Sequence, residues 1–250
     1  MPHSCGVSRT RLPTVPPEVI VLDREEPCSY LPGQTARRPL RLPIRRLTGD
    51  EFDRRLEAGD RRSGTFLYTQ ACPTCRACEP IRVDVRAFAP SRIQRRVRAR
   101  ADARVDVSVG PIEVDHERVA LYLRHESARD LDRGHPPIDD VGYEAFLASS
   151  CVDGFEIRYV VDGELAAVAI TDRGARSLSA VYTYWDPRHA ALSLGTYSIL
   201  TQIERARQAG LDWVYLGLAI EANHSMAYKL RFLPHERRID GVWRRFTRPT

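Results

Sequence analysis

The chain has 250 residues, of which 43% are hydrophobic and 28% are charged, so the composition is that of a globular protein and excludes disorder as the main state. A chain of this length forms one large domain or two small ones. No apolar run approaches the roughly 18 to 20 residues that a membrane helix needs. The N-terminal segment carries prolines where a signal peptide needs an unbroken apolar stretch. These observations favour a cytoplasmic protein.

The positive charge is concentrated in the first half of the chain. Lys229 is the single lysine among 38 Lys and Arg residues, so the other 37 are arginine. Residues 1–110 carry 21 arginines and 13 acidic residues, a net charge of +8, whereas residues 111–250 carry a net charge of −3. A basic half joined to a near-neutral half indicates contact with a polyanion such as RNA. The alternative is an arginine-rich composition with chance clustering.

Residues 1–18 are predicted to form a flexible leader, and residues 19–110 a basic, cysteine-rich N-terminal domain of short strands and turns. A helix is expected after Pro90, because Ser91 and Gln94 have the spacing of a capping box.

On this helix Ile93, Val97 and Ala101 are expected to form a narrow apolar stripe. Four arginines would then face solvent or a partner: Arg92, Arg95, Arg96 and Arg100.

Residues 111–250 are predicted to form a second domain in which helices and strands follow one another regularly. The expected strands are 155–161, 164–172, 178–185 and 213–220, and the expected helices are 115–130, 140–149, 193–209 and one from about residue 225. Asp162-Gly163 supplies the positive φ values of a tight hairpin turn between the first two strands. This order predicts an α/β (α+β) protein whose C-terminal domain has an N-acetyltransferase-like fold with a mostly antiparallel sheet.

Three cysteines stand at metal-ligand spacing in ACPTCRACEP: Cys72, Cys75 and Cys78. Two residues between thiols allow a turn to direct both sulfurs at one metal ion. Cys28 is the best candidate for a fourth ligand. Four thiolates would hold zinc or an iron–sulfur cluster, and the spacing does not choose between them. Reduced structural cysteines or a redox pair are the alternatives.

The segment FLYTQACPTCRACEPIRVDVRAFAPSRIQRR, residues 66–96, resembles the bacterial aminoacyl-tRNA–protein transferases, which comprise aspartate/glutamate leucyltransferases and their arginyltransferase relatives. Further matching blocks lie in the same order as in that family and extend the resemblance over about residues 20–240. These blocks are CSYLPGQTA (28–36), RRSG (61–64), VYTYWDP (181–187), SLGTYSILTQIE (193–204) and WVYLGLAIEANHSMAYKLRF (213–232).

The resemblance implies an enzyme that transfers an amino acid from tRNA to the α-amine of proteins with an N-terminal Asp or Glu, which marks them for degradation. It favours leucine as the transferred residue, with arginine as the alternative. The expected partners are aminoacyl-tRNA and acidic protein N-termini, with no DNA and no membrane. By motif position, the iron–sulfur cluster of eukaryotic relatives falls on Cys28, Cys72, Cys75 and Cys78. Asn223 stands where many bacterial members have cysteine.

Aminoacyl transfer joins an amine to an ester that is already activated, so neither a metal nor a covalent nucleophile is required. The enzyme must position the two ends, deprotonate the incoming ammonium and stabilise a tetrahedral oxyanion. An acidic acceptor side chain calls for a cationic partner, for which arginine offers two parallel N–H donors. Arg82 and Arg231 are the candidates, and Lys229 is a third because it is the only lysine and lies inside a family block.

Tyr228 and Lys229 are predicted to take part in catalysis, Tyr228 as a proton relay or oxyanion donor. Ser193 and Gly195 begin a helix whose free N–H groups favour negative charge, so Ser193 is assigned to the oxyanion and Gly195 to the tRNA terminus. The four arginines of the 91–101 helix are assigned to tRNA phosphates. For each of these residues the alternative is an ordinary surface or packing role.

Two other functions fit parts of the sequence. A coenzyme-A acetyltransferase needs a glycine-rich loop around pyrophosphate, and residues 188–195 lack its paired glycines. A non-enzymatic RNA-binding module built on a zinc knuckle would not need the long, regular second half.

Overall fold

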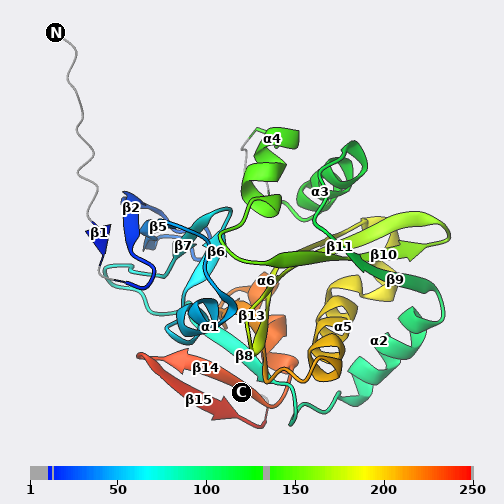
Figure 1. The fold of residues 1–250 in the computed structure, drawn as a ribbon. Coiled ribbons are helices and arrows are strands. Elements are labelled where there is room, and N and C mark those ends of the chain that lie inside the picture. Colours follow the sequence, from blue (N-terminus) through cyan, green and yellow to red (C-terminus); the bar gives the residue numbers. More distant parts are fainter. Residues whose placement is uncertain (1–10, 13, 132–135, 249–250) are drawn as a thin grey trace.

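The computed structural model describes residues 11–12, 14–131 and 136–248. Figure 1 shows a smaller sheet beside a larger one, with helices on both faces of the larger sheet. The strands of the first half are β1 (Arg11–Leu12), β2 (Glu18–Leu22), β3 (Glu25–Pro27), β4 (Thr35–Arg37), β5 (Leu40–Pro43), β6 (Arg61–Ser63), β7 (Phe66–Tyr68), β8 (Glu79–Asp84) and β9 (Val105–Gly110). Those of the second half are β10 (Gly154–Val161), β11 (Glu164–Arg173), β12 (Ser177–Trp185), β13 (Trp213–Ala219), β14 (His235–Ile239) and β15 (Val242–Phe246).

The helices alternate with these strands. They are α1 (Gly49–Glu57), α2 (Arg92–Asp102), α3 (His116–Ala128), α4 (Asp140–Tyr143), α5 (Leu194–Gln208) and α6 (His224–Ala227), with short η1 (Glu144–Ala148), η2 (Pro187–Leu192) and η3 (Tyr228–Arg231). Within the described ranges, every helix is too short or too polar to span a bilayer.

The smaller sheet has the strand order β1-β2-β5-β7-β6 and forms the N-terminal lobe together with helix α1. A capping box between Thr48 and Glu51 starts α1, because each side chain satisfies a free backbone N–H of the other residue. Phe52 and Leu56 lie on one face of α1, with 1% and 3% of their surfaces exposed, and hold the helix against the lobe.

The larger sheet has the order β15-β14-β8-β13-β12-β11-β10-β9. Among its described strands, β12 and β13 form the one parallel pair and all other neighbours are antiparallel. Helices α3 and α4 cover one face and α2 and α5 the other (Figure 1). The predicted α/β architecture with a mostly antiparallel sheet is confirmed, as is the hairpin turn at Asp162 (φ 53°) and Gly163 (φ 84°).

The boundary predicted at residue 110 does not follow the sheets. Strand β8 pairs with β13 and β14 near the centre of the larger sheet, and β9 forms its edge. The smaller lobe therefore ends near residue 78. The predicted leader, 1–18, lies mostly outside the described residues, but Glu18 already begins β2 and is fully buried against Arg41 and Arg55.

Helix α2 begins as predicted, with reciprocal hydrogen bonds between Ser91 and Gln94. The predicted apolar stripe is wrong at Ile93, which is 72% exposed. Gln94 takes the inward position instead, and its side-chain amide donates to the carbonyl oxygen of Arg231 at 3.2 Å. A polar side chain with its own partner can replace an apolar one on the buried face, which hydrophobic spacing alone does not reveal.

The hairpin of β14 and β15 was not predicted, because HERRI and VWRRF are rich in charge and show no regular apolar alternation. Two of their four arginines form contacts within the protein. Arg237 pairs with Glu79 and Glu221 and lies over the ring of Phe246, and Arg245 pairs with Asp84.

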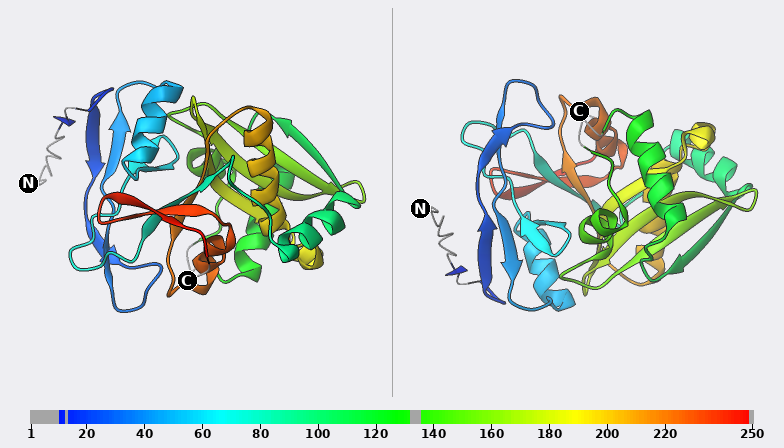
Figure 2. Two further views of the ribbon diagram at one scale, coloured as in Figure 1. Left: turned by 90° about the horizontal axis from the view of Figure 1, so that it is seen from below. Right: turned by 90° about the horizontal axis from the view of Figure 1, so that it is seen from above.

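A buried ion pair connects the two lobes. The Nε of Arg62 on β6 donates to Asp172 on β11 at 2.7 Å, and the two side chains are 1% and 0% exposed. The same guanidinium donates to the carbonyl oxygens of Gly64 and Ser149 at 3.2 and 3.0 Å. Arg62 therefore fixes the position of β6 against the larger sheet. Figure 2 shows the N-terminal strands along one side of the larger unit in both views.

Replacing Arg62 with methionine should lower the free energy of unfolding by about 3–5 kcal/mol, because the carboxylate of Asp172 stays buried without its partner. Urea denaturation followed by circular dichroism measures this loss. The matched control is Arg54→Met on the exposed side of α1, which should change stability by less than about 0.5 kcal/mol. Equal stability of the two variants would contradict a structural role for the pair.

Candidate active site between the lobes

A cavity of about 720 Å³ lies between the two lobes. One wall comes from strands of the smaller sheet, with Arg61 and Tyr68, and from Tyr30 in the β3–β4 connection. The other comes from α3, β12, β13 and the α6–η3 segment. The size and the mixed polar and aromatic lining are those of a site for a small ligand or a substrate end.

Lys229, the single lysine of the chain, lines this cavity from η3. Its Nζ donates to the carbonyl oxygen of Leu218 on β13 at 2.9 Å and lies 3.7 Å from the sulfur of Met226. Burial, and to a smaller degree the positive charge of Arg61, lower the pKa of Lys229 to about 7. Its amine is therefore about half neutral near pH 7.

Aromatic side chains form the wall opposite Arg61. His125 of α3 lies 4.1 Å from the ring of Trp185 of β12, centroid to centroid, and both line the cavity. Burial lowers the pKa of His125 to about 4, so this histidine is neutral near pH 7. Glu126 contributes a carboxylate to the same wall and accepts a hydrogen bond from Tyr182. Tyr228, predicted as a catalytic residue, lines the cavity next to Lys229, and burial raises its pKa.

The four predicted metal-binding cysteines line a second cavity of about 390 Å³. Cys28 comes from the β3–β4 connection and Cys72, Cys75 and Cys78 from the loop before β8. Burial and the nearby thiols raise the pKa of Cys78 to about 12. Tyr30, Arg38, Arg61 and Tyr68 line both cavities, so the cysteine cavity and the inter-lobe cavity share a wall.

The donor set of this second cavity suits a thiophilic metal, because four thiols from two segments line it and would repel one another when charged. A cation would relieve that repulsion. Over the described part of the chain, no three Cys, His, Asp or Glu side chains stand in an arrangement that could hold a metal ion. Binding would require the thiols to draw closer together.

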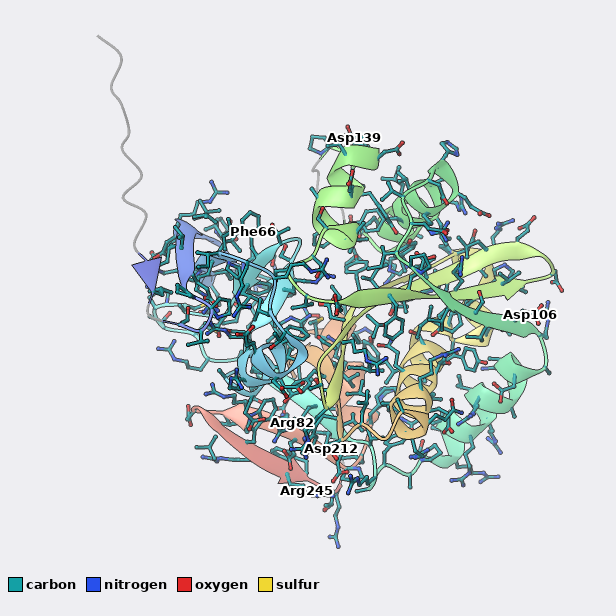
Figure 3. All side chains as sticks on the ribbon, in the orientation of Figure 1. Phe66, Arg82, Asp106, Asp139, Asp212 and Arg245 are labelled. Atoms are coloured by element: carbon teal, nitrogen blue, oxygen red, sulfur yellow. The ribbon has the colours of Figure 1, made fainter. Side chains whose placement is uncertain are left out.

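Arg82 does not fit its predicted role as a receptor for the acceptor carboxylate. It lies on β8 with 7% of its surface exposed, between the rings of Trp213 and Trp243 at 3.8 and 4.2 Å. Its guanidinium bonds Glu236 and Glu57 and donates to the hydroxyl of Tyr215 at 3.0 Å. Figure 3 labels Arg82 beside Asp212 and Arg245, near the C-terminal hairpin. These contacts hold Arg82 against α1, β13 and the C-terminal hairpin, which gives it a structural role.

The other predicted arginines lie on the surface. Arg231 is exposed on η3, outside both cavities, and its carbonyl oxygen contacts α2. The four arginines of α2 predicted to bind tRNA are all exposed, and in the described residues none of them pairs with an acidic side chain. They are Arg92, Arg95, Arg96 and Arg100. Arg231 therefore lies next to the basic helix α2 and does not line either cavity.

Ser193 and Gly195 lie at the start of α5, outside both cavities. Ser193 has left-handed backbone (φ 54°) and its side chain makes no capping hydrogen bond. Gly195 packs against the face of Trp185: a Cβ there would stand 3.1 Å from the ring. The first turn of α5 therefore supports the aromatic wall from behind. The role of Ser193 in stabilising the oxyanion and that of Gly195 in binding the tRNA terminus remain predictions.

Sequence reasoning missed three residues of the inter-lobe cavity: Arg61, His125 and Glu126. Arg61 could have been found, because it opens the RRSG block. His125 and Glu126 lie in an ordinary amphipathic helix, and only the packing of α3 against β12 brings them to the cavity.

Most of the chain is similar in sequence to known proteins. The family profile described as "Arginine-tRNA-protein transferase, N terminus" matches residues 26–96, and "Arginine-tRNA-protein transferase, C terminus" matches residues 117–239. The aspartate/glutamate leucyltransferase of Chromobacterium violaceum is 38% identical over 87% of this chain and 89% of that protein. That of Thiobacillus denitrificans is 36% identical over 92% and 97%. The chain belongs to the arginine-tRNA-protein transferase family, and these leucyltransferases are its relatives.

The prediction of an aminoacyltransferase acting between tRNA and protein is thereby confirmed, and the coenzyme-A and RNA-binding alternatives lose their support. Among solved structures, FemX is similar with a TM-score of 0.47 at 9% identity, over 79% of this chain and 68% of that one.

Proposed function

We propose that this transferase is a cytoplasmic enzyme that moves leucine from leucyl-tRNA to the α-amine of proteins that begin with Asp or Glu. The observation that carries the proposal is the inter-lobe cavity, which combines the single lysine, an aromatic wall and residues of all six family blocks. The relatives at 36–38% identity are named for this activity. Arginine as the transferred residue is the second candidate, from the name of the family profile.

Lys229 is suited to remove the proton from the incoming α-ammonium. The hydrogen bond to Leu218 fixes one N–H of its amine. In the neutral form the lone pair remains available to the cavity. A base works best with a pKa near the working pH, and the pKa of about 7 meets that condition. The deprotonated acceptor amine then attacks the ester carbon to form the amide bond. As the ester bond to the tRNA breaks, the leaving ribose oxygen takes up the second proton that the attacking nitrogen loses.

The tRNA approaches from the basic side of the molecule in this proposal. The exposed arginines of α2 and Arg231 form a surface without acidic partners, which suits phosphate contact. The acyl end would reach the cavity beside Trp185, whose ring α5 supports through Gly195. Tyr228, next to Lys229, is placed to donate its hydroxyl proton to the developing oxyanion, since burial keeps its pKa raised and the group protonated.

The decisive experiment mixes the purified protein with labelled leucyl-tRNA or arginyl-tRNA and peptides that begin with Asp, Glu, Lys or Ala. We expect leucine to enter the Asp and Glu peptides only. Transfer of arginine instead would establish the second candidate, and absence of transfer with every pair would refute the function.

Transfer by the wild type should rise as the pH increases through about 7, because the neutral amine of Lys229 is the active form and it accumulates above that pKa. Lys229→Arg should abolish most transfer at every pH, because a guanidinium stays protonated. Initial rates between pH 6 and 9 measure both. Lys229→Met is the second variant, and thermal melts should show that it loses activity far more than stability. A wild-type rate independent of pH over this range would contradict the assignment.

We also propose that Cys28, Cys72, Cys75 and Cys78 hold zinc or an iron–sulfur cluster that fastens the smaller lobe. The support is the four-thiol donor set facing one cavity. Elemental analysis and the absorption spectrum of anaerobically purified protein should show bound metal and identify it. Cys75→Ser should lose that metal and lower the melting temperature, whereas Cys151→Ser, in the apolar core of the smaller lobe, should keep it. Metal-free wild type with full activity would refute the site.

A further inference from the structure

One cation in the wall of the inter-lobe cavity lacks a counter-ion. Arg61 lines the cavity, and in the part of the chain that the structure describes its guanidinium forms no hydrogen bond or ion pair with another side chain. Its Nε is fully buried and has no partner at all. Neighbouring arginines are different: Arg62 pairs with Asp172, and Arg38 pairs with Glu26. A partly buried guanidinium that lines a cavity without a counter-ion among the described residues suits an anion that arrives from outside.

The backbone of β13 is shaped to receive this guanidinium. The pairing of β13 with β8 shifts register between Tyr215 and Gly217, which is a β-bulge. Gly217 has φ 83°, and a Cβ at this position would overlap with the Nη1 and Cζ atoms of Arg61. The glycine therefore lets the planar guanidinium lie flat against the strand. Bulges of this kind often direct a side chain into a functional site.

Arg61 also lies beside Lys229. Its positive charge contributes to the lowered pKa of Lys229, so the two cationic groups face the same region of the cavity. In an N-terminal aspartate the α-amine and the side-chain carboxyl carbon are only three bonds apart. A carboxylate held by Arg61 therefore brings the α-amine close to the amine that we propose as its base.

We propose that Arg61, seated on Gly217, is the acceptor-binding residue that recognises the side-chain carboxylate of an N-terminal Asp or Glu. This inference rests on the proposed function and assigns its acceptor specificity to one side chain. The planar guanidinium offers two parallel N–H donors, which match the two oxygens of a carboxylate but not an amide or an ammonium. Asn has the same size as Asp and lacks only the charge. Comparing acceptor peptides that begin with Asp or Asn therefore measures the contact between the carboxylate and Arg61.

The test measures binding separately from transfer. Fluorescent peptides that differ only in their first residue, Asp or Asn, are titrated with wild type and with Arg61→Gln. We expect the wild type to bind the Asp peptide about 10- to 100-fold more tightly than the Asn peptide. Arg61→Gln should bind both equally while its affinity for leucyl-tRNA stays unchanged. Arg61→Lys should retain part of the preference, because it keeps the charge without the fork.

Arg54→Gln is the matched control, since it removes the same charge from an exposed position on α1 and should keep the full preference. Thermal melts should show no loss of stability for Arg61→Gln, because the change breaks no ion pair of the described residues. Gly217→Ala, if it folds as judged by its melt, should lose the preference with Arg61 still present.

The outcomes separate the inference from the function on which it rests. Leucyl transfer by the wild type, with the preference for Asp kept in Arg61→Gln, would overturn the role of Arg61 and leave the function standing. A preference that depends on Arg61 in a protein that transfers nothing would support the acceptor site and refute the transfer. A wild type that binds Asp and Asn peptides equally would overturn the inference.

Discussion

The buried pair of Arg62 and Asp172 is the interaction on which the arrangement of the site depends. It joins β6 of the smaller sheet to β11 of the larger one at a position from which water is excluded. Loss of either side chain would leave the charge of the other buried without a counter-ion, which is strongly destabilising. Successive side chains of a strand point to opposite sides. With Arg62 fixed to Asp172, its neighbour Arg61 reaches β13, and the inter-lobe cavity acquires its unpaired cation.

The electrostatics of the cavity follow from this placement. Arg61 supplies a guanidinium to the cavity wall, whereas Lys229 in the same cavity can lose its proton at about pH 7. Two neighbouring cationic groups in a poorly solvated space favour an anionic ligand and discourage a second positive charge on the lysine. In our proposal these are two aspects of one function: the acidic side chain of the acceptor is held by Arg61, and its amine is deprotonated by Lys229. The opposite wall, with Trp185, His125 and Glu126, remains for the aminoacyl end.

Local sequence patterns predicted helix α2 and the second half of the chain well. The capping box at Ser91, the Asp162-Gly163 turn and the strands around them depend on neighbouring residues, and each was found where expected. The boundary expected at residue 110 and the acceptor role expected of Arg82 differ from the contacts in the structure for one reason. Strand β8 is distant in sequence from β13 and β14 and pairs with both, so a segment assigned to the N-terminal domain lies in the larger sheet with Arg82 enclosed between two tryptophans.

By itself, the sequence determined the family, the class of fold and the identity of the unusual residues, because motif blocks and short-range periodicity are properties of the chain order. It singled out Lys229 and the four cysteines, and the structure shows each of them lining a cavity. Only the tertiary structure decided which of the 37 arginines line the inter-lobe cavity and, among the described residues, which of these have an acidic partner. That distinction depends on which acidic groups lie within a few ångströms in space, and sequence separation carries no information about those distances.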